Sequence, residues 1–392
     1  MPLPTALTQV IDTAVEREAE GLFRLAHNIH QHPELCFEET KAAAWITELL
    51  ESRQHGVERG LGGLSTALRA RAGQPNGPKV AILAEYDALP GIGHACGHNL
   101  IAAGAVGAFL AAAEVAEQAG GEVILLGTPA EEGGGGKIRL LEAGVFKGID
   151  SAMMFHPLDR DLLAHPALAS LWITFTFRGI PSHAAAAPHA GRSALTACLD
   201  TFRLIDGQRV HFRDGVRVHG YITNGGQAVN IIPELAACEF SVRSPDHTEL
   251  DRVRLIVERC ARGAAIASDV EVRSEVRQGY REMKNNLTLA RCFGSHLQAL
   301  GRHAPETDPH LGAGSTDMGD VSQVIPAIHP YLAIVNEGEA FCHEPRFADA
   351  AGSDQGLQAA LLAAKALART AIEVIGDGAL RGAIQSEWSA QR

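Results

Sequence analysis

The first 166 residues alternate between continuous apolar runs and segments with helical spacing. A strand that is covered on both faces of a sheet shows an unbroken apolar run of this kind. Helical segments follow the first two runs, and Asn99 is the expected N-cap of the first helix. The expected strands are 79–84, 121–127 and 150–155, and the expected helices between them are 99–118 and 137–144. This order predicts a mostly parallel sheet in an α/β domain.

The two ends of the chain share this texture. Segment 14–51 has helical spacing, interrupted by the polar turn HNIHQHPELCFEE around Pro33. Near the C-terminus, the polar loop 312–322 is expected to open a strand-like run at 324–327. A further strand is expected at 330–335, and a long Ala-rich helix at 352–372.

The pattern changes at about residue 167, where LWITFTFRG alternates apolar and polar positions as a half-exposed antiparallel strand does. Helices are expected at 192–204 and 248–265, and further strands at 217–223, 236–243 and 270–276. The second helix places Val253, Val257, Cys260 and Ala264 on one stripe. The order β-α-β-β-α-β predicts a ferredoxin-like α+β module, 167–279, inserted into a domain formed by 1–166 and 280–392.

Composition excludes some classes of partner. The net charge of -12 argues against nucleic acid, which requires clustered Lys and Arg. The N-terminus lacks a secretory pattern and no uninterrupted apolar run reaches about 18 residues, so no membrane partner is expected. Seven scattered cysteines favour a reducing compartment over a disulfide framework. We therefore expect a cytoplasmic protein.

Candidate chemistry follows each of the three parallel strands. Cys96 and His98 lie in GHACGHN after the first strand, and a thiolate and an imidazole two residues apart can hold one metal. Glu131 and Glu132 follow the second strand, where one carboxylate can bind a metal while the other takes a proton from water. His156 follows the third. The alternatives are a buried cysteine beside surface histidines, a solvated acidic turn and a capped core residue.

The combination outweighs these alternatives, because ligands of open parallel sheets bind beyond the carboxyl ends of the strands. His343, in FCHEP, is the natural further ligand from the C-terminal part. This number of ligands suits two divalent ions if one ligand bridges them.

The sequence resembles the large family of aminoacylase/carboxypeptidase-type metallopeptidases over nearly its full length. It is most similar to the branch with aminobenzoyl-glutamate hydrolase, the hippurate and indole-acetyl-amino-acid amidohydrolases and the β-alanyl-lysine-type dipeptidases. The matching blocks are HPEL at 32–35, YDALPGIGHACGHN at 86–99, PAEEGGGGK at 129–137, Ser182-His183-Ala, Asn230-Ile-Ile-Pro, Gly314-Ser-Thr-Asp317, Ile328-His329-Pro330 and His343.

The resemblance implies roles for these positions. Cys96 bridges the two ions, His98 and His156 complete one of them, and Glu132 and His343 complete the other. Glu131 is the general base and then the acid, and Asp87 orients a ligand imidazole. His183, from the partner subunit of a homodimer, helps to hold the oxyanion. Asn230 and Arg243 bind the substrate carboxylate, although Arg243 could equally be a strand-end surface charge.

Two departures from the wider family concern the metal site. Asn99 stands where many relatives have Asp, which marks the dipeptidase-like subgroup. A bridging thiolate replaces the usual carboxylate, which leaves the choice among zinc, manganese and cobalt open. Outside the site, His165, His189, His211 and His219 are expected at the surface, and His94 beside the ligands. Cys36, Cys198, Cys238, Cys260 and Cys292 are expected as buried small hydrophobes, and packing is also the expected role of Cys342.

The predicted function is metal-dependent hydrolysis of the amide bond in a small N-acyl amino acid or dipeptide, with release of a free amino acid. One alternative is a non-catalytic binding or regulatory protein on the same fold, which should have lost a ligand or Glu131. Another is a family deacetylase with a different acyl substrate. The sequence retains every expected ligand but does not identify the acyl group.

Overall fold

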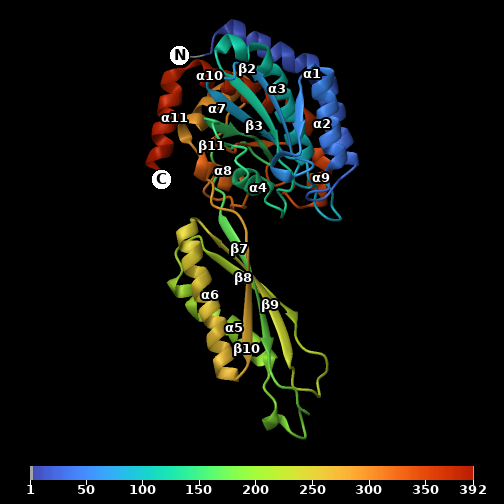
Figure 1. Ribbon diagram of the computed structural model, residues 1–392, viewed down its shortest axis with the longest axis vertical. Helices are drawn as coiled ribbons and strands as arrows, with labels where there is room; N and C mark the ends of the chain where they lie inside the picture. Colours follow the sequence, from blue (N-terminus) through green and yellow to red (C-terminus); the bar gives the residue numbers. More distant parts are fainter. Residues whose placement is uncertain (1–2, 392) are drawn as a thin grey trace. The chain divides into compact units, whose positions relative to one another are not determined.

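The computed structural model describes residues 3–391 and divides the chain into two compact units, which are described separately (Figure 1). The main unit comprises the chain up to Pro166, Met283–Ala313 and the chain from Asp317. The inserted unit comprises Ala167–Glu282 and Gly314–Thr316. Each unit has a hydrophobic core of its own.

A six-stranded sheet in the order β1-β2-β4-β3-β5-β11 forms the centre of the main unit. The four strands β4, β3, β5 and β11 are parallel, whereas β2 and β1 continue the sheet antiparallel at one edge. The bounds are β1 Val57–Arg59, β2 Leu68–Gly73, β3 Lys79–Ala84, β4 Glu122–Gly127, β5 Ser151–Met153 and β11 Ala327–Ile328. Two further strands, β6 (His156–Leu158) and β12 (Tyr331–Ala333), form a parallel pair. The mostly parallel sheet is confirmed.

The most buried helix is α3, His98–Ala119, which packs against α1 (Thr5–Gln31) and α10 (Asp354–Gly376). Its alanines and glycines allow this close approach: a Cβ on Gly104 would lie 2.4 Å from Phe155 Cε1. By length and composition alone α3 could cross a membrane, but 89% of its most apolar stretch is buried inside the protein. Burial of this kind is typical of a core helix.

The remaining helices of the main unit are short and cover the sheet and its loops (Figure 1). They are α2 Thr40–Ser52, η1 Leu61–Gly63, α4 Gly136–Glu142, α7 Leu287–Ala299, α8 Met318–Val324, α9 Pro345–Ala351 and α11 Gly378–Ala390. Two expectations were wrong. Gly97, not Asn99, is the N-cap of α3, and the Asn99 amide donates to Ala351 O at 2.8 Å. Residue 324 ends helix α8 rather than starting a strand.

The inserted unit is a four-stranded antiparallel sheet in the order β10-β7-β9-β8, with two long helices. In chain order this is 4-1-3-2, as the β-α-β-β-α-β pattern requires of a ferredoxin-like fold. The bounds are β7 Ala169–Arg178, η2 Pro188–Ala190, α5 Ala194–Gln208, η3 Arg209–His211, β8 Arg217–Asn224, β9 Leu235–Ser244, α6 His247–Ser268 and β10 Glu271–Gln278. The predicted stripe on α6 is buried, because Val253, Val257, Cys260 and Ala264 all lie in its core-facing set.

Candidate metal centre

The segment between β3 and α3 brings Asp87, Cys96 and His98 to the carboxyl end of the sheet. Asp87 follows β3 by three residues, and His98 is the first residue of α3. Gly97 has φ +76°, and a Cβ there would meet Pro157 Cγ at 2.7 Å. Glycine is therefore required at this turn, which places the side chains of Cys96 and His98 on the same side of the site.

The segment after β4 supplies the two adjacent carboxylates. Ala130 has φ +61°, an uncommon conformation for a residue with a side chain, and directly precedes Glu131 and Glu132. Two side chains hold this backbone in place: Glu39 accepts from Ala130 N at 2.9 Å, and Asp87 accepts from Glu132 N at 2.9 Å. The strained turn is thus fixed by buried carboxylates.

Two histidines complete the cluster from distant parts of the sequence. His156 is the first residue of β6, and its Nδ1 contacts Pro157 O at 2.7 Å, which leaves Nε2 free to face Cys96. His343 has φ +72°, and its backbone N donates to Ala95 O at 2.8 Å. That hydrogen bond ties the C-terminal loop to the residue before Cys96.

The potential ligand atoms fall into groups in which every atom lies within 4.8 Å of the others. One group is Cys96, His98 and His156; a second is Cys96, Glu132 and His343; a third is His98, Glu131 and Glu132. The first two share Cys96. Cys96 Sγ lies 3.5 Å from His156 Nε2, and His343 Nε2 lies 3.5 Å from Glu132 Oε2. These separations match two ligands of one ion, each about 2.0–2.3 Å from it.

The donor set fits divalent metal ions. Buried polar atoms normally have a hydrogen-bond partner. Here His98 Nε2 and Glu132 Oε1 are buried with none, and they lie 3.9 Å apart. Thiolate, imidazole and carboxylate ligands together suit a borderline transition ion such as zinc.

Asp87 connects the ligands to the surrounding protein. Its Oδ1 lies 3.1 Å from His98 Nδ1, which turns His98 Nε2 toward the cluster. Burial alone would raise the Asp87 pKa, but His98 and the backbone N–H of Glu132 outweigh it and lower the pKa to about 2. Asp87 is therefore an anion at any physiological pH, as a residue that orients a metal-binding histidine must be.

Glu131 is buried and surrounded by negative charge. Burial first, and then repulsion from Glu85 and Glu132, raise the pKa of its carboxyl. A raised pKa suits a carboxylate that first accepts and then returns a proton near neutral pH. Because it also belongs to the third ligand group, the geometry alone leaves a ligand role open for Glu131.

A buried triad beside this cluster was not expected from the sequence. Lys137, at the start of α4, is fully buried and contacts Glu85 Oε1 and, at 2.7 Å, Asp317 Oδ1. All three residues lie in blocks that the sequence analysis singled out, after β3, after β4 and in the loop before α8. Their charges were the available signal: two acids and a base at the end of the sheet that also carries the ligands.

The predicted residues His183, Asn230 and Arg243 belong to the inserted unit. His183 is exposed and pairs as an isolated bridge with Ile231, next to Asn230. Arg243, on β9, is half-buried and donates to Ser315 Oγ at 3.4 Å, so it is not the freely exposed strand-end charge considered above. The roles of these three residues stay predictions.

Other sequence expectations separate into right and wrong. His189, His211 and His219 are exposed, as expected, and His94 is buried in the loop that carries Cys96. His165 was expected at the surface but is buried, with Nε2 3.3 Å from Gly312 O. Cys36 was expected as a buried hydrophobe but is half-buried, and its thiol donates to Asp87 Oδ2 at 3.4 Å.

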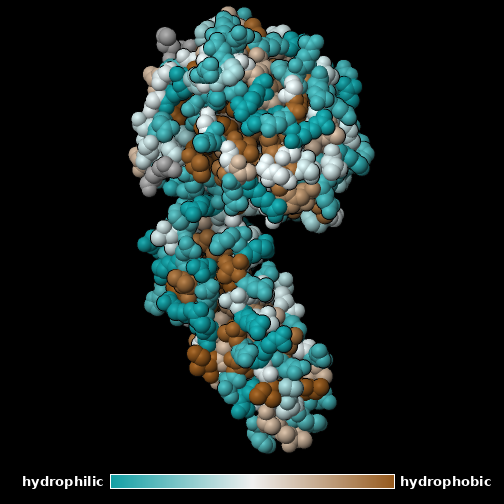
Figure 2. Space-filling model, viewed as in Figure 1, coloured by the Kyte–Doolittle hydropathy of each residue, from teal (hydrophilic) through white to brown (hydrophobic). Residues whose placement is uncertain are grey.

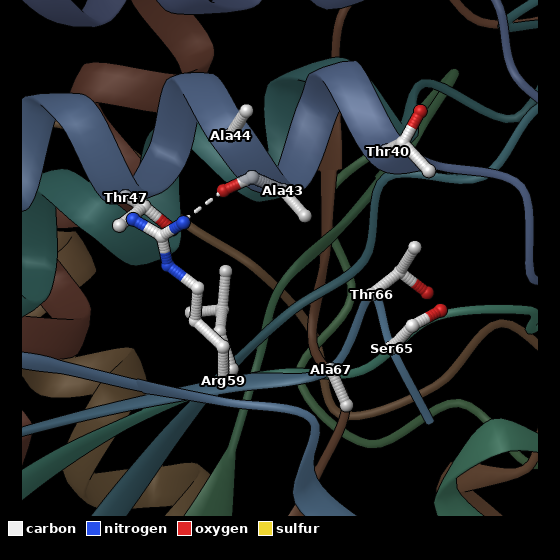
Figure 3. A pocket seen from close by; sticks show the side chains of 9 residues that line it. Thr40, Ala43, Ala44, Thr47, Arg59, Ser65, Thr66 and Ala67 are labelled. Carbon is white, nitrogen blue, oxygen red and sulfur yellow. Dashed lines mark hydrogen bonds between the residues drawn. The ribbon is translucent and has the colours of Figure 1, made fainter. Parts of the chain in front are cut away.

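Two other features of the main unit are distinct from the site. Cys292, His296 and Glu373 also cluster, but His296 Nε2 lies 2.7 Å from Glu373 Oε2, the distance of a direct ion pair between α7 and α10. A pocket between α2 and β2 (Figure 3) shares no lining residue with the ligand groups. It is lined by Thr40, Ala43, Ala44, Thr47, Arg59, Ser65, Thr66, Ala67 and Leu68.

Known proteins share this chain's sequence and fold. Residues 81–372 match the profile of peptidase family M20/M25/M40. The chain is 38% identical to the Xaa-Arg dipeptidase of Mus musculus, covering 96% of this chain and 91% of the relative. It is 33% identical to one of the subunits of the p-aminobenzoyl-glutamate hydrolase of Escherichia coli, covering 74% of this chain and 65% of that relative.

A solved structure shares the fold at lower identity. It is a dinuclear metal binding peptidase from the M20 family of Bacillus subtilis, with a TM-score of 0.73, 22% identity, and coverage of 92% of this chain and 99% of that one. The extent of the family match and the identity to the dipeptidase go beyond a likeness of fold. The chain belongs to peptidase family M20/M25/M40, and it is a metallo-amidohydrolase.

Proposed function

We propose that this protein hydrolyses the amide bond of small dipeptides or N-acyl amino acids at a centre of two divalent ions. One observation carries the proposal: two groups of three potential ligands share Cys96, and Glu131 lies beside them. Cys96, His98 and His156 hold one ion, and Cys96, Glu132 and His343 hold the other. Ions bound there lower the pKa of a bound water toward neutrality and polarise the amide carbonyl.

The protein's own side chains carry the proton. Glu131 takes a proton from the attacking water and then passes it to the leaving nitrogen, for which its buried position and raised pKa suit it. Asp87 keeps His98 oriented through Nδ1 throughout. His183, supplied by the second subunit of a dimer, stabilises the oxyanion, and Asn230 and Arg243 bind the substrate carboxylate.

The substrate class follows from the relatives. Proteins named Xaa-Arg dipeptidase and p-aminobenzoyl-glutamate hydrolase both release an amino acid from an amide. The higher identity and the fuller coverage belong to the dipeptidase, so a dipeptide is the preferred substrate that we propose. Zinc, manganese and cobalt are the candidate ions, since each accepts imidazole and carboxylate ligands.

The first test combines metal analysis with a substrate panel. Purified protein is assayed for bound metal by elemental analysis, and then for hydrolysis of dipeptides, aminobenzoyl-glutamate and N-acetyl amino acids. The panel is repeated after chelation and after return of zinc, manganese or cobalt. About two ions per chain and chelator-sensitive release of an amino acid support the proposal. A protein without metal and without turnover contradicts it and favours a binding protein.

We also propose a homodimer that forms through the inserted unit. Strand β8 is a free edge of its sheet, and unpaired edges invite pairing with another chain. The other edge, β10, is protected by exposed charged side chains, whereas β8 exposes Tyr221 and Ile222. Apolar patches are visible on this unit in the space-filling view (Figure 2).

The dimer is tested by placing a charge on the β8 edge. Tyr221→Lys is expected to shift the protein from dimer to monomer in sedimentation analysis and, because His183 then lacks its partner site, to lower kcat. Glu275→Lys on β10 is the matched control and should leave the dimer intact. A wild-type monomer with full activity would contradict the proposal. All seven cysteines are free, which supports the further proposal of a cytoplasmic location.

A further inference from the structure

We infer that Glu85 is a positioning carboxylate of the metal centre, with one oxygen held by Lys137 and the other strengthening cation binding at His98. Glu85 directly follows β3 and is completely buried. Neither the relatives' names nor the ligand groups among residues 3–391 include it. The inference rests on the proposed two-ion centre.

The first part of the argument is that Glu85 is locked in one orientation. Lys137 Nζ contacts Glu85 Oε1, and the same ammonium lies 2.7 Å from Asp317 Oδ1. The Lys137 backbone N also donates to Asp317 Oδ2, at 3.0 Å. Lys137 is therefore fixed through both its backbone and its side chain, so the Glu85 carboxylate that it holds cannot rotate freely.

The second part is that the other oxygen of Glu85 has no partner within the protein. Glu85 Oε2 is buried without a hydrogen bond and lies 3.6 Å from His98 Nε2. A buried carboxylate oxygen without a donor is costly unless positive charge lies near it. The triad itself does not balance, because one lysine faces two carboxylates. The excess negative charge is on the side of the cluster.

The third part is the distance pattern around His98. Its Nε2 lies 3.6 Å from Glu85, 3.9 Å from Glu131 and 3.9 Å from Glu132. Glu85 is thus as near to this nitrogen as the carboxylates of the third ligand group. Because it does not join that group, it acts on a bound ion through its charge or through a hydrogen bond from an ion-bound water, not as a direct ligand.

The test measures metal affinity instead of turnover. Zinc is titrated against a chromophoric chelator into metal-free wild type and into Glu85→Gln, which preserves shape and removes charge. Loss of a carboxylate that supports metal ligands typically costs 10–100-fold in affinity, and that fold-change is expected for at least one of the two ions. Far-UV circular dichroism checks that each variant is folded.

Two control variants separate this role from a purely structural one. Asp317→Asn removes the other partner of Lys137, and Glu122→Gln neutralises a buried carboxylate that pairs with Arg71 at the amino end of β4. Both should bind zinc within about threefold of wild type. Equal losses in Glu85→Gln and Asp317→Asn would overturn the inference, because the triad would then act only as a clasp.

The remaining outcomes are also decisive. Wild-type affinity in Glu85→Gln overturns the inference and leaves the two-ion proposal standing, whereas a wild type that binds no zinc, manganese or cobalt overturns both. If Glu85→Gln does not fold, Glu85→Asp keeps the charge for Lys137 but withdraws the oxygen by one methylene. It should bind zinc at least about threefold more weakly than wild type, and equal affinity would refute the role.

Discussion

Glu131 and Glu132 are adjacent in sequence but have different surroundings. The backbone N of Glu132 is held by Asp87, and its carboxylate reaches His343. Glu131 is the more buried of the two and is repelled by its acidic neighbours. The same chemical group is therefore suited to metal binding at one position and to proton transfer at the next.

Glu131→Gln is expected to keep its metal and lose turnover. Gln matches Glu in shape but cannot accept the proton of the attacking water, and general acid–base groups contribute about 10²–10⁴-fold to rate. The measurement is kcat on the best substrate of the panel, with metal content determined on the same sample. Near-normal turnover would remove the proposed role, and loss of an ion would instead assign Glu131 as a ligand.

His55 gives the main unit a pH dependence that is independent of the metal centre. Burial, with the ring 5.1 Å from that of Phe109, lowers the pKa of His55 in the folded protein. As the pH falls through about 6.5, the unfolded chain takes up a proton before the folded protein does, so stability is lost. His55→Gln should lose less stability than wild type in urea unfolding between pH 7.5 and 5.5. A constant difference across that range would contradict this expectation.

At the scale of elements, the packing of α3 depends on residues without side chains. A Cβ at Gly104 would lie 2.4 Å from Phe155 Cε1 and 3.3 Å from Ala360 O on α10. Neither neighbour is a flexible chain end, so both helix and sheet would have to shift. The usual gain from replacing a helical glycine is therefore reversed at this position.

Gly104→Ala is expected to destabilise the protein by about 1–3 kcal/mol, the typical cost of overpacking a core. Gly382→Ala, on the exposed side of α11 with nothing within 4 Å of the new Cβ, is the matched control. It should stabilise by about 0.5–1 kcal/mol, because it removes backbone freedom from the unfolded chain. Chemical denaturation measures both, and equal effects would show that packing at Gly104 is not limiting.

The elements that the sequence predicted well are those with a strong periodic signal. Strands β3 and β4 and helices α3 and α6 are long or uniformly apolar, so their burial is visible in the pattern. Strand β1 and helix α8 have three and seven residues and were missed or misassigned, because so short a segment has no period. Asn99 was misassigned as a cap because the left-handed Gly97 starts the helix earlier.

The candidate site divides in the same way. Cys96, His98, Glu132 and His156 could be grouped because each follows a parallel strand, and the sheet brings those ends together. The Glu85–Lys137–Asp317 triad could not, because no spacing rule links residues that are 52 and 180 positions apart. Burial of His165 likewise depends on its contact with Gly312, which only the folded chain shows.

At the scale of the whole molecule, the two units have separate cores and only the main unit holds the ligand groups found among residues 3–391. Metal should therefore stabilise one unit selectively. At 100 times its Kd, each ion adds about 2.7 kcal/mol to the stability of the state that binds it. For a unit of this size, 1 kcal/mol corresponds to about 2–4 °C in Tm.

Chelation is expected to lower the Tm of the main unit by about 5–20 °C and to leave the transition of the inserted unit unchanged. Scanning calorimetry of the metal-loaded and metal-free protein resolves the two. Cys198→Ser, within the core of the inserted unit, is the complementary variant and should move only the other transition. A single transition that shifts as a whole would show that the units unfold together.

The division of the main unit between the two ends of the chain affects its synthesis. Helix α3 leaves the ribosome early, but its partner α10 is translated only after the whole inserted unit. At about 5–20 residues per second, the apolar surface of α3 waits about 10–50 s for its cover. The inserted unit, encoded without interruption apart from Gly314–Thr316, can fold during that wait. The nascent chain is thus most exposed to aggregation and to chaperones in the interval between these two helices.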